Sequence, residues 1–313
     1  MSRRWLDFEI VVLHESDLRA RRVALNVSGA ALLLAIAKAA VGFAAGSIAL
    51  LSSALDSAGD AIASFANFLF LTVAAKPPDE DHQFGHGKAE HLAALLQGVI
   101  ILTGGVLLGI KAIDRIRHPV PVESSFVAIA TMLASIAATI FVTTYLKRNA
   151  ARSESSALAG DALHYTSDIV SNGATIIALI LVRFTGNPLF DSILGISVAC
   201  WIGWNSLYLI WNAGADLMDP ALPEEEIGSI IEAIERADAS VAGYRELRTR
   251  RAAGVRFVEF ELCIDRRVSF EKAHDVTELV KARIRDVFPR VVVTVHAEPV
   301  ESNGERTSRP LQC

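Results

Sequence analysis

Long apolar stretches alternate with short polar breaks over the first two thirds of the chain. Six of these stretches are each long enough to cross a hydrocarbon core of about 30 Å as a helix. Turn-forming residues separate them, for example at Pro77-Pro78 and at Gly186-Asn187-Pro188. The six predicted spans cover residues 23–46, 49–74, 91–113, 122–146, 155–182 and 189–213.

The pattern changes after Asp219-Pro220, where charged residues become frequent. Residues 223–237 begin with three glutamates and then place isoleucines at helical spacing, which predicts a helix. Two strand-like runs follow, and a second helix precedes a third strand. This α-β-β-α-β order predicts a small α+β domain of the ferredoxin-like kind, with its helices on one face of a three-stranded sheet. The four later elements cover residues 244–251, 255–264, 270–287 and 291–295.

Composition agrees with a polytopic α-helical membrane protein that carries a polar tail. Of the 313 residues, 52% are hydrophobic and 21% are charged. A net charge of −5 offers no basic stripe for nucleic acid, and the three cysteines are too scattered for a zinc knuckle or a redox pair. We expect a cytoplasmic segment at 1–22, a six-helix transmembrane domain at 23–214 and a cytoplasmic domain at 215–313.

Basic residues favour a cytoplasmic location for both termini. With the amino terminus inside, most lysines and arginines that flank the spans fall on the inner side, whereas Arg115, Arg117 and Arg183 fall outside. No apolar segment of the signal-peptide type precedes the first span, so we expect that span to stay in the membrane.

Ionisable residues inside the spans indicate a function, because a charge in lipid is costly unless it faces a cavity or a partner. Asp56 and Asp60 lie four residues apart in the second span, and His164 and Asp168 do so in the fifth. This spacing places each pair on one helix face. If the faces meet, three carboxylates and one imidazole form a site for zinc, ferrous iron or a similar divalent ion. A proton relay without metal, or aspartates that merely cap a span end, are the alternatives.

Two further ionisable residues lie within predicted spans. We interpret Lys38 as a residue whose long side chain reaches back to the membrane surface. Asp161, one turn before His164, either lines an inner vestibule or lies at the interface. Gly105 and Gly109 permit close helix packing, although this spacing alone does not identify a dimer contact.

A second cluster lies between the second and third spans. Asp79, His82 and His86 occur within eight residues, and Gly85 and Gly87 allow tight turns. Aspartate and histidine are zinc ligands. The same composition also suits an ordinary solvated loop, so the residues alone leave both readings open.

Taken together, the sequence resembles the cation diffusion facilitator family, in particular its bacterial zinc and ferrous-iron efflux branch. The resemblance extends over nearly the whole chain: the six spans, the inner termini and the α-β-β-α-β tail. Three local motifs carry it most specifically. They are Asp56-Ser57-Ala58-Gly59-Asp60, His82-Gln83-Phe84-Gly85-His86-Gly87-Lys88-Ala89-Glu90 and His164-Tyr165-Thr166-Ser167-Asp168.

The resemblance implies a homodimer in the bacterial inner membrane that exports divalent metal in exchange for protons. Zinc is the expected metal, with cadmium and ferrous iron as further substrates. A divalent metal, again most simply zinc, is also expected as a structural ion. The resemblance further implies a transport site, a loop site and a salt bridge that joins the dimer. These consist of Asp56, Asp60, His164 and Asp168; of Asp79, His82 and His86; and of Lys88 with Asp219.

The tail departs from the family pattern. Glu261, His274, His296 and Glu298 stand at positions that match a metal site of close relatives. However, Arg245 and Glu261 replace histidines there, and a guanidinium has no lone pair to offer a metal. A plain dimerisation domain is therefore the alternative reading of the tail.

Other functions are less consistent with the sequence. An exporter selective for ferrous iron, cobalt or manganese remains open, because these metals tolerate similar ligands. A membrane-anchored metal sensor should carry its strongest ligand set in the tail, not in the spans. An intramembrane zinc protease would need an HExxH motif, which the chain lacks, so we expect no enzyme activity.

Overall fold

A computed structural model describes residues 15–45, 48–118, 126–187, 189–252, 254–288 and 290–301. Most of the predicted amino-terminal segment (1–14) and the start of the fourth predicted span (122–125) lie outside the described residues. The chain divides into two compact units, Met1–Gly214 and Ala215–Cys313.

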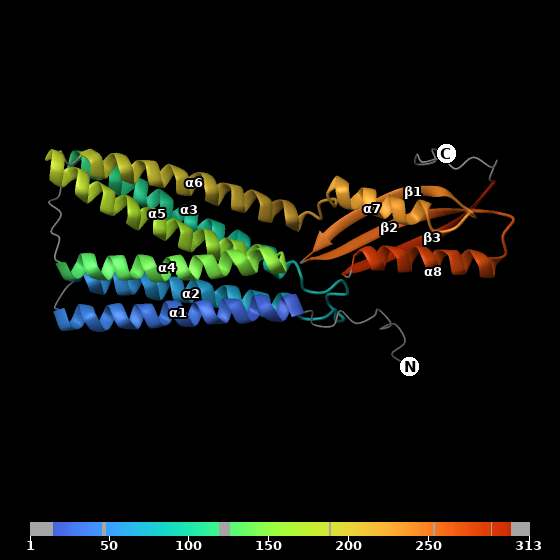
Figure 1. Cartoon of the computed structure of the whole chain (residues 1–313), viewed down its shortest axis with the longest axis horizontal. Helices are drawn as coiled ribbons and strands as arrows, with labels where there is room; N and C mark the ends of the chain where they lie inside the picture. Colours follow the sequence, from blue (N-terminus) through green and yellow to red (C-terminus); the bar gives the residue numbers. More distant parts are fainter. Residues whose placement is uncertain are drawn as a thin grey trace. The chain divides into compact units, whose positions relative to one another are not determined.

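Six long helices make up the described part of the first unit and correspond to the six predicted spans (Figure 1). All of these helices except α2 continue past their apolar stretch into polar end residues, which the hydropathy pattern alone does not detect. The helices are α1 (Glu15–Ala45), α2 (Ile48–Ala74), α3 (Ala89–Arg117), α4 (Phe126–Ser153), α5 (Ser156–Thr185) and α6 (Leu189–Leu217).

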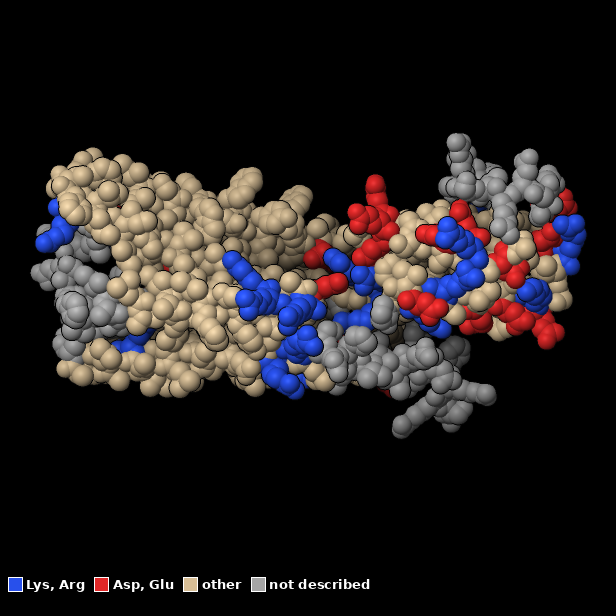
Figure 2. Space-filling model, in the orientation of Figure 1, with Lys and Arg blue, Asp and Glu red and all other residues tan. Residues whose placement is uncertain are grey.

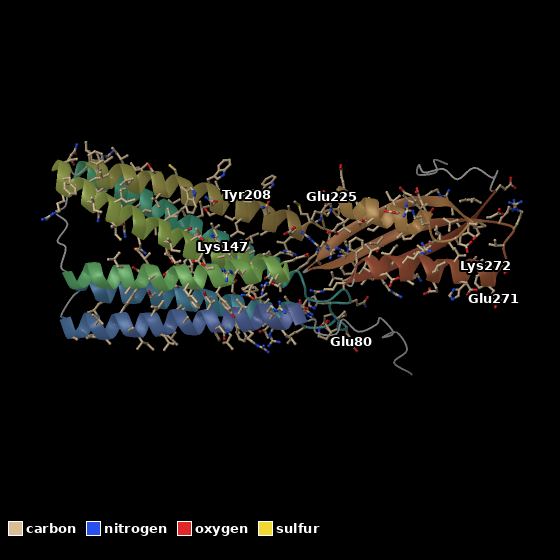
Figure 3. The ribbon with its side chains drawn as sticks, in the orientation of Figure 1. Glu80, Lys147, Tyr208, Glu225, Glu271 and Lys272 are labelled. Carbon is tan, nitrogen blue, oxygen red and sulfur yellow. The ribbon has the colours of Figure 1, made fainter. Side chains whose placement is uncertain are left out.

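The outer surface of these helices is that of a membrane domain. Among the described residues, α1, α2, α3, α5 and α6 are long and apolar enough to cross a membrane by length and composition. α4 has 28 residues, which makes it about 42 Å long. Phe43, Phe141 and Phe184 are exposed, and Tyr208 projects outward from α6 (Figure 3). On the face that Figure 2 shows, charged side chains are almost absent from the middle of the helical unit.

Small and branched apolar residues fill the interior where α1, α2, α4 and α5 pack together. Val23 and Val27 of α1 are almost fully buried, and Leu146 of α4 and Leu158 of α5 are completely buried. Hydroxyl groups add interhelical hydrogen bonds, such as the one that Ser28 Oγ donates to the carbonyl oxygen of Ala61 at 3.2 Å. This bond fixes the register of α1 against α2.

Glycines allow α3 to approach α6 closely. A Cβ atom on Gly105 would lie 2.8 Å from Cγ2 of Ile202, and one on Gly98 would lie 2.7 Å from Cγ1 of Ile210. A Cβ on Gly109 would contact Ala199 at 3.4 Å. The predicted close packing at Gly105 and Gly109 therefore takes place within one chain.

The tail has the predicted α-β-β-α-β order, with α7 (Glu224–Glu235), β1 (Val241–Ala252), β2 (Val255–Asp265), α8 (Phe270–Val287) and β3 (Val291–Val300). The sheet order is β1-β2-β3, with β1 antiparallel and β3 parallel to β2. β3 extends beyond its predicted end at 295, because residues up to Val300 continue to pair with β2 despite their polar pattern.

Both tail helices cover one face of the sheet and enclose a single apolar core (Figure 1). Ile230 and Ile234 of α7, Val280 and Ile284 of α8, and Leu262 of β2 are all completely buried. Helical spacing on the helices and alternation on the strands both direct these residues inward. The predicted α+β tail is thus confirmed.

Candidate metal-transport site

Asp60, His164 and Asp168 form a cluster inside the helical unit. His164 Nε2 lies 2.9 Å from Asp60 Oδ1 and 4.0 Å from Asp168 Oδ2. One ligand atom from each residue lies within 4.8 Å of the others. A tetrahedral zinc ion, with ligands at about 2.1 Å, holds neighbouring ligand atoms about 3.4 Å apart. The three side chains can therefore share one ion after small movements.

Neighbouring polar contacts hold α5 against α2 so that these side chains meet. Ser155 caps the start of α5, where its Oγ accepts a hydrogen bond from the Leu158 N–H at 3.3 Å. Ser64 Oγ on α2 lies 3.1 Å from the Tyr165 hydroxyl, and Asn67 Nδ2 donates to the Ala157 carbonyl oxygen at 3.3 Å. These contacts fix the rotation of α5 that turns His164 towards Asp60.

Asp56, the fourth predicted ligand, does not join this cluster. Its side chain is exposed one helical turn from Asp60, and the three-residue group does not include it. The structure thus brings together three of the four predicted transport-site residues. A fourth position on a tetrahedral ion stays available to Asp56 or to water.

Lys38 points into the bundle, so our interpretation that it reaches back to the membrane surface was wrong. Its Nζ donates a hydrogen bond at 2.8 Å to Oγ of Ser57, which is buried on α2 next to Asp56. The physical reason is that the Cα–Cβ bond of a helical residue tilts towards the helix amino terminus. For Lys38, that direction leads away from the nearby end of α1.

Asp161 is completely buried, so its side chain faces neither solvent nor lipid. Ser64 and Asn67 of α2 are its polar neighbours, and His164 lies one turn further along α5. Asp161 therefore belongs to the polar interior between α2 and α5, beside the cluster.

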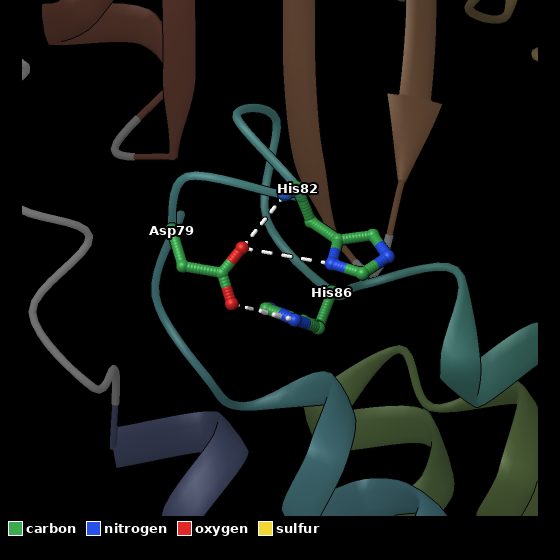
Figure 4. A group of neighbouring side chains, drawn as sticks. All are labelled: Asp79, His82 and His86. Carbon is green, nitrogen blue, oxygen red and sulfur yellow. Dashed lines mark hydrogen bonds and ion pairs between the residues drawn. The ribbon is translucent and has the colours of Figure 1, made fainter.

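The loop between α2 and α3 forms the second cluster, with Asp79 between two imidazoles (Figure 4). Asp79 Oδ1 lies 3.5 Å from His82 Nδ1, and its Oδ2 lies 3.3 Å from His86 Nε2. The His82 and His86 ring centres are 4.6 Å apart. One ligand atom from each of the three residues lies within 4.8 Å of the others, as in a site for one metal ion.

Backbone geometry shapes this loop and keeps its carboxylate charged. The backbone N–H of His82 donates to Asp79 Oδ1 at 2.7 Å and lowers the pKa of Asp79. Gly85 adopts a φ of 83°, a conformation that favours glycine, and packs against Pro78. His86 Nδ1 is buried and has no hydrogen-bond partner among the described residues. The loop therefore presents an ionised oxygen and imidazole nitrogens to one point.

The predicted tail residues do not converge in the chain. Arg245 forms an ion pair with Glu261 at 3.3 Å across β1 and β2, while His296 pairs with Glu298 at 3.1 Å. His274 is exposed on α8. Among the described residues of the tail, no three metal-binding side chains meet at one point.

The predicted salt bridge between Lys88 and Asp219 would connect two chains. A single chain does not test it, so it stays a prediction. Within the tail, Arg250 donates to Asp219 Oδ1 at 3.2 Å, and the Arg250 guanidinium also lies over the Phe257 ring. Lys88 lies just before α3, at the end of the loop that holds the second cluster.

Comparison with known proteins shows which family the chain belongs to. Residues 25–218 match the model of the cation efflux transmembrane domain, and residues 222–300 match that of the cation efflux protein cytoplasmic domain. The chain is 34% identical to a cation-efflux pump FieF of Shewanella oneidensis, over 82% of this chain and 86% of the relative. It is 32% identical to FieF of Cronobacter sakazakii, over 91% and 95% of the two chains.

A solved structure of MamM-CTD 215-293 is 28% identical to the chain and covers 25% of it and 98% of the solved chain, with a TM-score of 0.24. The family models and the relatives together span both units, and the relatives are pumps that export cations. The expected resemblance is confirmed: the chain belongs to the cation diffusion facilitator family of divalent-cation efflux transporters.

Proposed function

We propose that the protein exports zinc from the bacterial cytoplasm across the inner membrane in exchange for protons. The observation that carries this proposal is the cluster of Asp60, His164 and Asp168 within an apolar helical unit. Ionisable side chains are energetically costly within an apolar helical unit, so their presence there indicates a function such as ion transport. The imidazole nitrogen favours zinc, and also cadmium or ferrous iron, over harder ions.

Metal ions and protons compete for the same ligand lone pairs, and this competition couples metal export to proton import. His164 binds a metal only as a neutral imidazole, so the arriving ion displaces a proton, and a returning proton displaces the ion. The 2.9 Å separation between His164 Nε2 and Asp60 Oδ1 suits a hydrogen bond that holds such a proton. Rocking of helices around this fixed site would expose it to either side in turn.

Three further features complete the proposal. Asp79, His82 and His86 bind a second metal ion at the cytoplasmic side, and both termini lie in the cytoplasm. The tail joins two chains into a homodimer, in which Lys88 and Asp219 form a salt bridge. We do not assign a strong metal site to the tail, because Arg245 already neutralises Glu261.

Two alternatives make different predictions. An exporter selective for ferrous iron, cobalt or manganese would use the same cluster with another preferred ion. A membrane-anchored metal sensor would hold its main metal site in the tail, whereas both three-residue clusters among the described residues lie outside it. The positions of the clusters favour the exporter.

The test uses purified protein in vesicles loaded with one zinc-sensitive dye and one pH-sensitive dye. Asp60→Ala should abolish zinc flux, while Asp114→Ala, which removes a carboxylate from an exposed part of α3, should leave it intact. Undiminished flux with Asp60→Ala would end the proposal for the site. Zinc flux that never changes the luminal pH would refute proton exchange.

A further inference from the structure

Lys38 is a basic side chain directed at the transport site. α1 and α2 are joined by a two-residue connection and run antiparallel (Figure 1). The bond between Ser28 and Ala61 sets their register, which places the Lys38 backbone near residue 51 of α2. Its ammonium nevertheless bonds Ser57, roughly 9 Å further along α2. The side chain therefore extends along the helix pair towards the level of Asp56 and Asp60.

Ser57 holds the ammonium beside the carboxylates without making it a ligand. Ser57 lies between Asp56 and Asp60 in sequence and is 7% exposed. The ammonium is also close enough to attract the Asp168 carboxylate on α5. Lys38 thus acts on the carboxylate of α5, while its 2.8 Å bond to a neutral hydroxyl group of α2 fixes its position.

The formal charges around this position are complementary to one divalent cation. Asp56, Asp60 and Asp168 contribute three negative charges when ionised, and Lys38 contributes one positive charge. With a neutral imidazole, the metal-free site therefore carries two negative charges, and one divalent ion makes it electroneutral. Net charge is costly in a membrane interior, so this balance has a large effect on occupancy.

We propose that Lys38 is the fixed counter-charge of the transport site, which makes the loaded site neutral and keeps metal binding weak enough for release. This inference rests on the proposed function, because it concerns the same carboxylates. Without the ammonium, the loaded site would keep one uncompensated negative charge. The ion would then bind more tightly and leave more slowly.

The test measures initial zinc flux in vesicles over a range of zinc concentrations. Lys38→Gln keeps a polar side chain but has no charge, so KM and the maximal rate should both fall by about tenfold. Lys38→Arg keeps the charge and should stay within about threefold of the unmodified protein in both quantities. Lys111→Gln, which removes an exposed lysine of α3, should change neither. A merely structural defect would lower the maximal rate but would not lower KM.

A second uncharged variant provides an independent test in case K38Q is poorly folded. Lys38→Met also removes the charge and keeps a long side chain, so KM should again fall by about tenfold. A KM equal to or above that of the unmodified protein in a folded K38Q or K38M variant would overturn the role of Lys38. Absence of zinc flux in the unmodified protein would instead overturn the proposed function.

Discussion

The ligand at position 164 should decide which metals the transport site accepts. His164 supplies the nitrogen of the Asp60–His164–Asp168 cluster. In His164→Asp, an oxygen replaces this nitrogen and suits harder ions such as manganese. We expect transport to persist while the preference for zinc over manganese falls by about tenfold, measured by competition between the two metals in one flux assay. An unchanged preference would remove the reason for assigning zinc.

The loop cluster should bind one metal ion independently of transport. Backbone N–H groups lower the pKa of Asp79 below its usual range and so favour its charged form, and its removal therefore takes away a charged ligand. Asp79→Ala should reduce the metal content of the purified protein by one ion per chain and leave zinc flux measurable. Elemental analysis checks the first result and vesicle flux the second.

Asp81→Ala provides the matched control for the loop. Asp81 lies two residues from Asp79, is exposed and contributes only its backbone N–H to the cluster. Its side chain should therefore be dispensable for the bound ion. Equal metal content in the Asp79 and Asp81 variants would contradict a metal site at Asp79, His82 and His86.

At the scale of elements, two adjacent glycines of α3 should respond differently to substitution, because only Gly105 lies against α6. A Cβ at Gly105 would lie 2.8 Å from Cγ2 of Ile202, whose β-branched side chain has little freedom to move in a helix. Gly104 has no atom within 4 Å of its would-be Cβ. Gly105→Ala should therefore destabilise the protein by about 1–3 kcal/mol.

Gly104→Ala is the matched control, since alanine favours a helix over glycine by about 1 kcal/mol. It should leave the thermal stability unchanged or raise it slightly. The measurement is the midpoint of thermal unfolding of both variants in detergent. A higher midpoint for Gly105→Ala than for Gly104→Ala would show that α3 and α6 do not pack as described.

At the scale of the whole molecule, opposite charges at Lys88 and Asp219 should join the dimer. Lys88→Glu places two acidic groups together, so the dimer fraction in detergent should fall by about tenfold at low protein concentration. The exchange K88E/D219K restores an opposite pair and should recover the dimer. Sedimentation of the single and double variants measures this, and equal dimer fractions in all of them would contradict the bridge.

Much of the architecture could be predicted from the sequence, because it depends on local patterns. The six helices follow from apolar length, and α8 begins and ends at its predicted residues, 270 and 287. The ligand pairs on α2 and α5 follow from four-residue spacing and from the cost of charge in lipid. β3 was predicted too short, because its last residues are held by pairing with β2 and not by their hydrophobic pattern.

The sequence by itself determined the elements, their order and the candidate ligands, since each is encoded over a few neighbouring residues. Only the tertiary structure decided which side chains meet. His164 reaches Asp60 across 104 positions of the chain, Asp56 stays outside their cluster, and Lys38 turns inwards to Ser57. These outcomes depend on the rotation and register of packed helices, which are set by many distant contacts at once and leave no local signature.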